Sequence, residues 1–202
     1  MLTMKYISLL LIFFILTGFK HKEATSLQDR DGIFYEVNAE QPFTGKLVEY
    51  WGGGQNKAEK HFKEGKKDGD TTSWYENGQK QYETSYKDGK LDGVLTTWYK
   101  NGQKRSESSH KDGKRDGVST SWYENGRKDT EAHYKDAKLD GILTTWYESG
   151  QKRTESSYKD GKQDGVSTSW YENGQKQFET NYKDGNEDAQ TIEWDENGEE
   201  LP

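Results

Sequence analysis

Aromatic, apolar and polar positions recur in this chain with a fixed period of 24 residues. A Trp returns once per cell, and the row comprises Trp74, Trp98, Trp122, Trp146, Trp170 and Trp194. A period of this size is typical of a repeat protein, in which each repeat is one supersecondary unit. Alternate cells resemble each other more than neighbouring cells do, so we infer that the recently duplicated unit is a pair of cells, 48 residues long.

Each cell contains two predicted strands and two predicted turns. The run 94–99 is β-branched and aromatic, which favours a strand. The pair Asn101-Gly102 is the strongest short-range hairpin signal, and we expect a two-residue type I′ turn there. The pair Asp88-Gly89 marks the second reversal of the chain. No apolar pattern repeats at 3.6 residues, so we expect no helix in the repeats.

The sequence therefore predicts an all-β fold, an elongated single-layer antiparallel meander of repeated β-hairpins. Two strands per cell, spaced by about 4.8 Å, advance the sheet by about 10 Å per cell. In such an array each repeat contacts only its neighbours, so stability accumulates along the ribbon.

A register follows from the expected turn at Asn101-Gly102. It places Trp98 opposite Arg105 and Gly93 opposite His110, and the equivalent hairpin places Gly69 opposite Tyr86. If neighbouring cells stack without slippage, this aromatic column has glycine on both sides, and each ring packs over a bare glycine. The structural columns are Gly69, Gly93, Gly117, Gly141 and Gly165, with Tyr86, Tyr134, Tyr158 and Tyr182.

Alternation along a strand separates the rows onto two faces. One face carries the Trp row with Val94, Val118, Ile142 and Val166, and the other carries the Tyr that follows each Trp and the Tyr86 column. The Trp row is either sheet packing or a binding strip, because one layer cannot bury both of its faces. We expect Arg105 and Arg153 to stack on Trp98 and Trp146.

Composition alone resembles a disordered chain, because only 29% of residues are hydrophobic and 32% are charged. The aromatic fraction of 13% and the strict period argue for an ordered sheet. The chain has no Cys, which excludes disulfides and thiol chemistry. The net charge of −7 argues against a nucleic-acid partner. The acidic end, 184–202, is either a solvated tail or a guide for a basic partner.

The N-terminal region has a different character. Residues 1–18 combine Lys5, an apolar run over 7–16 and a small residue, which is typical of an export signal peptide. Phe19 stands where a lipoprotein signal needs Cys, so a diacyl anchor is excluded. We expect a cleaved signal, with an uncleaved membrane anchor as the alternative, then a linker over 19–31 and the repeat array over 32–202. The expected location is the periplasm, the envelope or the exterior.

Motifs for catalysis or metal binding do not assemble in this sequence. The run 52–54 is a triple glycine without a following Lys, so it is a turn variant and not a phosphate loop. Asp88 and Asp92 recur in each cell with lysines beside them, which opposes a cation. Neither the four His nor the many Ser residues lie in a zinc or nucleophile motif. We expect no enzyme activity, no catalytic residue, no cofactor and no metal ion.

The repeated motif Y-K-D-G-K-x-D-G-x-x-T-x-W-Y-E-N-G-Q-K resembles the MORN repeat variant found in bacterial YwqK-like antitoxins. The resemblance covers about residues 32–200. It implies an antitoxin or immunity protein that binds and neutralises a toxin. MORN repeats elsewhere imply scaffolding of membrane lipid or protein. A kinase label attached to related repeats does not transfer, because the chain lacks the Gly-rich loop, the strand Lys and the catalytic motifs of phosphoryl transfer.

Two functions follow from this reading. The first is an exported protein-binding module that neutralises a toxin acting in the envelope, with the Trp row as its candidate strip. The second is an envelope-associated scaffold that binds lipid, glycan or another envelope protein.

Overall fold

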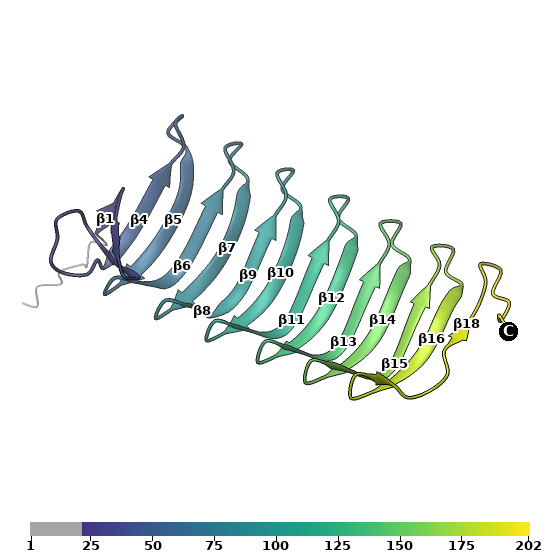
Figure 1. Cartoon of the computed structure of the whole chain (residues 1–202). Helices are drawn as coiled ribbons and strands as arrows, with labels where there is room; N and C mark the ends of the chain where they lie inside the picture. The colour runs from purple at the N-terminus through teal and green to yellow at the C-terminus, as the bar shows by residue number, and fades with distance from the viewer. Residues whose placement is uncertain (1–21) are drawn as a thin grey trace, which may run out of the picture.

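The computed structural model of the chain describes residues 22–202, and the expected export signal over 1–18 lies outside the described residues. Figure 1 shows one long ribbon of hairpins laid edge to edge. The main sheet has 16 strands, and consecutive strands are hydrogen-bonded neighbours from β4 to β7 and from β9 to β17. The described residues contain no helix with the length and apolar character needed to cross a membrane. The predicted all-β meander is confirmed.

The strands have these bounds: β1 (Glu23–Ala24), β2 (Gln28–Arg30), β3 (Ile33–Tyr35), β4 (Gly45–Tyr50), β5 (Asn56–Lys63), β6 (Lys66–Trp74), β7 (Lys80–Lys87), β8 (Lys90–Leu91), β9 (Gly93–Trp98), β10 (Lys104–Lys111), β11 (Lys114–Trp122), β12 (Lys128–Lys135), β13 (Lys138–Trp146), β14 (Lys152–Lys159), β15 (Lys162–Trp170), β16 (Lys176–Lys183), β17 (Asn186–Glu187) and β18 (Ile192–Glu193). The hairpins from β4 to β16 therefore repeat with the period of the sequence.

The type I′ turn occurs at the Asp-Gly reversal and not at the Asn-Gly reversal. Asp88 and Gly89 both have positive φ, at 48° and 83°, between the paired residues Lys87 and Lys90. At the other end of the hairpin only Gly102 has positive φ, at 87°. Its N–H bonds to the Tyr99 carbonyl, and Tyr99 N–H bonds to Gln103. This is a three-residue loop that ends in a left-handed glycine, so the expected two-residue turn at Asn-Gly is wrong.

The longer loop changes the register near the Trp row. Trp98 pairs with Lys104 and not with Arg105, and the register then shifts so that Thr96 faces Glu107 and Gly93 faces His110 as expected. The extra residue is a β-bulge, in which two residues of one strand oppose a single residue of its partner. The same shift occurs between the Trp and the residue before it in every hairpin from β6–β7 to β15–β16.

The glycine column pairs with the Tyr86 column on one side only. Gly69 faces Tyr86, but across the next turn Tyr86 faces Leu91 instead of Gly93. The glycines have positive φ, from 102° at Gly69 to 127° at Gly93. A Cβ added at each would meet the Cβ of a Ser or His on the preceding strand, and no tyrosine ring lies within 4 Å of it. The positive φ favours glycine at every position of the column, and the close approach of His133 adds to this at Gly141. The expected flanking of each ring by glycine on both sides is wrong.

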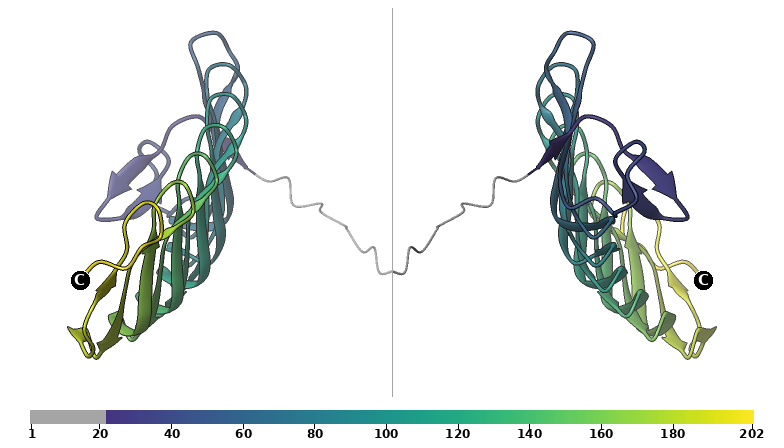
Figure 2. Two further views of the ribbon diagram at one scale, coloured as in Figure 1. Left: turned by 90° about the vertical axis from the view of Figure 1, so that its right-hand side faces the viewer. Right: turned by 90° about the vertical axis from the view of Figure 1, so that its left-hand side faces the viewer.

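The described part of the linker expected over 19–31 forms an N-terminal cap together with the residues that follow it, and the cap here means residues 22–44. Strand β1 pairs in parallel with β4, and β2 and β3 form a separate two-stranded sheet. Figure 2 shows this small sheet beside one face of the ribbon. The cap residues Leu27, Phe34 and Phe43 join Leu47 and Phe62 in the hydrophobic core cluster. The cap thus covers the first hairpin, and the ribbon proper begins at β4 rather than at residue 32.

The two faces of the ribbon differ in burial. One face, here called the small-residue face, carries short side chains that are at most 8% exposed: Ala58, Thr71, Ser73, Thr84, Ser108, Ala132, Ser156, Ser167, Ser169 and Thr180. The cap covers only the first hairpin. In the later hairpins the neighbouring strands bury these short side chains without a second layer. The other face, here called the Trp face, keeps its larger side chains partly exposed.

Candidate functional site

The candidate site is the Trp face, where every hairpin contributes the same set of side chains. In the hairpin β9–β10 these are Trp98, Thr96 and Val94 on one strand, with Lys104 and Glu107 on the other. Strand alternation and the bulge at Arg105, opposite the step from Thr97 to Trp98, place all five on one face. The arrangement repeats in each cell, so the face carries parallel rows that run along the ribbon.

The tryptophan rings of the candidate strip are half-buried rather than free. A lysine from the preceding hairpin lies over each ring from Trp98 onward, at 5.2 to 5.6 Å from the ring centroid. The same lysine forms an ion pair with a Glu three residues later on its own strand, at 2.5 to 2.7 Å. Lys80 illustrates the arrangement, because it lies over Trp98 and pairs with Glu83. The Trp row is therefore tied into the sheet by cation–π contacts.

The arginines do not lie where the sequence placed them. Arg105 lies over the Tyr99 ring and Arg153 over the Tyr147 ring, at 5.9 and 5.7 Å from the centroids. The bulge is the cause, because Lys104 pairs with Trp98 and Arg105 is the extra residue without a partner on β9. The Arg105 side chain therefore lies over the tyrosine that follows the Trp. The expected stacking of Arg105 on Trp98 and of Arg153 on Trp146 is wrong.

The tyrosine after each Trp has a structural role that sequence reasoning missed. Its hydroxyl donates a hydrogen bond to the backbone carbonyl of the Trp in the next cell, as from Tyr123 to Trp146 at 2.7 Å. The row of donors is Trp51, Tyr75, Tyr99, Tyr123, Tyr147 and Tyr171, with the indole N–H of Trp51 replacing the hydroxyl. We call this row the tyrosine ladder. It joins each cell to the next.

Half-exposed aliphatic side chains of the Trp face form a row of their own, here called the aliphatic strip. Its members are 43 to 51% exposed: Val94, Val118, Ile142 and Val166. Sequence alternation placed these residues beside the Trp row but gave them no role. Single apolar side chains scattered over a surface are normal, but contiguous exposed apolar side chains mark contact surfaces.

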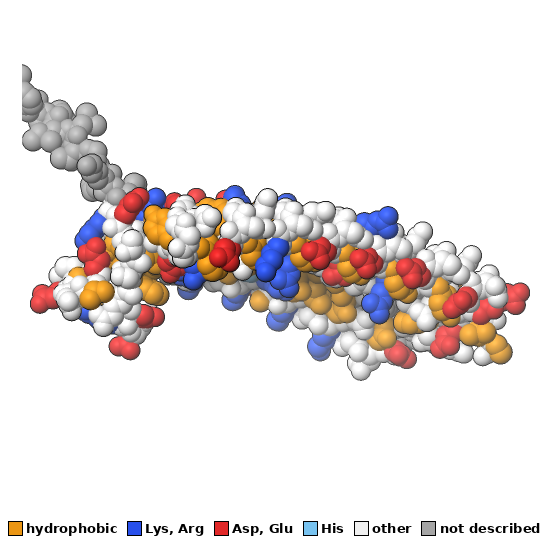
Figure 3. All heavy atoms as spheres, turned by 90° about the horizontal axis from the view of Figure 1, so that it is seen from above, with side chains coloured by type: hydrophobic (Ala, Val, Ile, Leu, Met, Phe, Trp, Pro, Cys, Tyr) orange, Lys and Arg blue, Asp and Glu red, His pale blue; other side chains and the backbone are white. Residues whose placement is uncertain are grey.

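The two edges of the ribbon carry different charges. The edge of the Asn-Gly loops bears one acidic residue in most loops, and Lys100 interrupts the row. In Figure 3, which views this edge from above, acidic side chains follow one another along the ribbon. At the opposite edge most turns lie between two lysines that pair directly across the strands, as Lys87 with Lys90 and Lys111 with Lys114, whereas Lys183 pairs with Asn186 at the last turn. Like charges in direct cross-strand pairs are unfavourable.

The recurrent aspartates of this second edge serve the stacking of turns. A carboxylate oxygen of Asp92 accepts the N–H of Asp112 in the next turn, and Asp116 does the same for Asp136. Among residues 22–202 no group of three His, Asp or Glu side chains has a metal-binding arrangement. The pKa of Asp164 lies below its ordinary value because Lys183 donates a hydrogen bond to it and Asp184 N–H does so as well.

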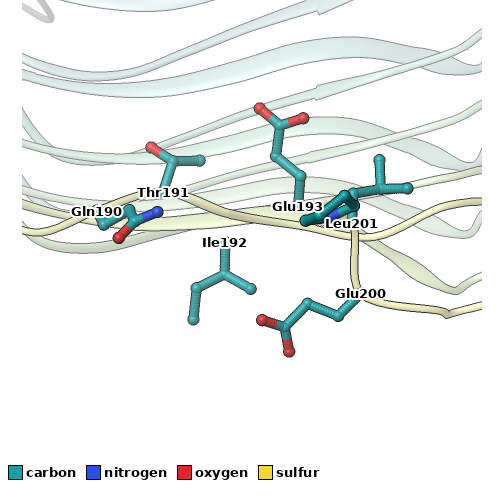
Figure 4. Close-up of a pocket in the computed structure, with 7 residues that line it drawn as sticks. Gln190, Thr191, Ile192, Glu193, Glu200 and Leu201 are labelled. Atoms are coloured by element: carbon teal, nitrogen blue, oxygen red, sulfur yellow. The ribbon is translucent and has the colours of Figure 1, made fainter.

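The acidic end folds back against the last hairpin. Ile192 and Glu193 pair with β16, and Trp194 bridges to Glu200. Figure 4 shows the hollow that results, with a volume of about 550 Å³. The labelled side chains include Glu193, Glu200 and Leu201, so the hollow is acidic at its rim. It is open and polar, with no group poised for chemistry among its lining residues.

Comparison with known proteins identifies the repeated unit. No curated protein matches the chain. The model of the MORN repeat variant family matches five consecutive segments, which cover 67–88, 91–112, 115–136, 139–160 and 163–184. Each matched segment runs from one lower-edge turn to the next (Asp-Gly in most cells) and contains one Trp, one tyrosine-ladder residue and one Asn-Gly or Ser-Gly loop. These segments together span more than half of the chain, so this protein belongs to the MORN repeat variant family.

Proposed function

We propose that this protein is a non-enzymatic binding module that engages another protein through the aliphatic strip of its Trp face. The observation that carries the proposal is the exposure of Val94, Val118, Ile142 and Val166 in one row. When a partner completes the burial of one half-exposed side chain, the binding free energy improves by about 1 kcal/mol. A partner that lies along the ribbon gathers these increments from successive cells, with the half-buried Trp row at the border of the contact.

The repetition itself supports a binding role over catalysis. The same few side chains recur in every cell, whereas a catalytic centre needs different groups that converge at one place. Along the middle of the small-residue face, the short side chains are already buried within the sheet and offer little to a partner. The Trp face is therefore the favoured contact surface, and MORN repeats indicate a binding role for the chain.

We further propose that the partner is a toxin acting in the cell envelope, which this protein neutralises. Support comes from the likeness of the repeated motif to YwqK-like antitoxins and from the export signal expected over residues 1–18. An exported immunity protein meets a toxin in the envelope but not one in the cytosol, so the two indications agree.

The experiment is affinity capture by the full chain from the envelope fraction of its own cells. We expect one dominant partner, whose recovery falls at least about tenfold for the V118Q/I142Q double variant, since two of the four strip contacts are lost. The matched control is V37Q, because Val37 is 61% exposed but lies in the N-terminal cap, away from the strip. Equal capture by the double variant would refute the strip. Toxicity of the captured protein, relieved by co-expression of this chain, is the expected result for an antitoxin, and its absence would refute that role.

A second candidate function, an envelope-associated scaffold, is favoured by the lysine pairs. Five successive turns each place two lysines side by side at one edge: Lys63 with Lys66, Lys87 with Lys90, Lys111 with Lys114, Lys135 with Lys138, and Lys159 with Lys162. An anionic lipid or glycan surface relieves this repulsion between like charges. Co-sedimentation with anionic vesicles or cell wall, lost at high salt, supports the scaffold, and no sedimentation contradicts it.

A further inference from the structure

A cavity of about 340 Å³ lies between the N-terminal cap and the first hairpin. The cap contributes Leu27 and Phe34, and strands β4 and β5 contribute Leu47 and Phe62. The rings of Phe34 and Phe62 pack at 5.1 Å between centroids, so one wall is aromatic. The other side of this concave space is polar, so it offers a ligand both apolar and polar contacts, as small-ligand sites do.

The polar side of the cavity carries one more positive than negative charge. Glu49 and Lys60 line it as an ion pair at 2.9 Å, which neutralises both. Lys67 also lines the cavity, and no carboxylate of residues 22–202 forms an ion pair with it. Its ammonium lies 4.8 Å above the Tyr86 ring. A partly buried cation with an aromatic ring as its only close partner is open to an anion.

Burial and the positive charge of Lys60 lower the pKa of Lys67. The charged form of Lys67 is therefore less stable here than in water, with Glu49 as the one acid that opposes the effect. An anion held against this ammonium removes part of that penalty.

We propose that the cavity binds a small amphiphilic anion, a carboxylate with a hydrocarbon chain of medium length. The carboxylate lies on the Lys67 ammonium, and the chain lies against Leu27, Phe34, Leu47 and Phe62. At about 30 Å³ for each non-hydrogen atom, the space accommodates on the order of ten such atoms. Octanoate, with ten, matches this size.

The site occurs only once in the described chain. The positions equivalent to Lys67 in later cells are Leu91, Arg115, Leu139 and Gln163, and those residues have no cap above them. The proposed ligand therefore binds with one equivalent per chain, which separates it from a partner that lies along the repeated Trp face.

The experiment is calorimetric titration of the full chain with octanoate and, as a probe without charge, with octanol. We expect one equivalent of octanoate with a Kd between about 0.1 and 1 mM, the range for a ligand of this size. We expect K67M to lower the affinity for octanoate by at least about tenfold and to leave the affinity for octanol unchanged. K90M is the matched control, since Lys90 is exposed at a turn and does not line the cavity.

A second variant separates loss of charge from loss of fold. S26F fills the cavity from the cap without removing a charge, so it abolishes binding of both probes while the unfolding midpoint of the ribbon stays unchanged. Equal affinity for octanoate and octanol, or equal binding of octanoate by K67M and the wild type, would overturn the proposal. Several equivalents per chain would assign the binding to the exposed surface and overturn it too. None of these three results bears on the capture of a partner by the aliphatic strip.

Discussion

Replacement of Ala137 by glycine stabilises the protein. Ala137 occupies the second position of its turn with φ at 68°, whereas the five equivalent turns place glycine there at 75° to 90°. Its N–H makes the same bond to the preceding cell, at 2.8 Å to the Arg115 carbonyl. The structure therefore holds an alanine in a left-handed conformation without a compensating contact, and that conformation costs a non-glycine residue about 1 to 2 kcal/mol.

The magnitude follows from two opposing terms. Glycine removes the strain but loses about 0.4 to 1 kcal/mol more chain entropy on folding. The net gain for A137G is therefore about 1 kcal/mol. Steric contact contributes nothing, because a Cβ at the equivalent Gly113 lies 3.7 Å from the Lys90 Cβ, an ordinary packing distance.

The assay is urea unfolding followed by tryptophan fluorescence, with the slope m compared between variants. The matched control is G89A, which places alanine in an equivalent turn and is expected to cost about 1 kcal/mol. Because the two turns lie two cells apart, the double variant A137G/G89A returns to the stability of the wild type. An unchanged or lower midpoint for A137G, at constant m, would refute the assignment of strain to this turn.

The remaining predictions concern the glycine column, the tyrosine ladder and an ion pair. G141A destabilises the protein more than G93A does, because the new Cβ at 141 lies 2.9 Å from the His133 Cβ, whereas the new Cβ at 93 lies 3.6 Å from the Ser85 Cβ. A lower urea midpoint for G93A than for G141A would contradict this. Y123F removes the hydroxyl that bonds Trp146 and costs about 1 kcal/mol, checked by the same assay against the wild type. Asp164 has a lowered folded pKa, so its stabilising effect is complete above its ordinary value of 3.8 and is lost as pH falls through the folded pKa. The unfolding free energy of D164N therefore falls less than that of the wild type as the pH drops below about 4. An equal fall for both proteins would contradict the lowered pKa of Asp164.

The sequence was sufficient to predict the strands because each strand is indicated by the residue types along its own segment. The run from Val94 to Tyr99 is β-branched and aromatic, and its period leaves one way to lay the hairpins side by side. The positions of the Trp row and the aliphatic strip on one face follow from alternation alone.

The turn types depended on contacts between cells, which a single cell does not reveal. Both dipeptides, Asn-Gly and Asp-Gly, suit a type I′ turn. The Asn loops instead extend to three residues, and the Asn77 side chain bonds the Lys100 carbonyl in the next cell. That longer loop creates the bulge which moves Arg105 away from Trp98.

The cap was missed for a different reason. Leu27, Phe34 and Phe43 are widely spaced within a polar segment and follow no period. Their common environment against Leu47 and Phe62 exists only after the first hairpin has formed. The exposure of the aliphatic strip was equally beyond the sequence, because it depends on which face the sheet leaves uncovered.

The open ribbon, on which the binding proposal rests, is tested most directly by a distance between two spin labels. The chain contains no Cys, so E76C and E172C provide two unique attachment sites in equivalent loops four cells apart. At about 10 Å per cell, the account predicts one narrow distribution centred near about 40 Å. A distribution centred below about 25 Å, as in two layers packed on each other, would contradict the single-layer ribbon and its exposed strip.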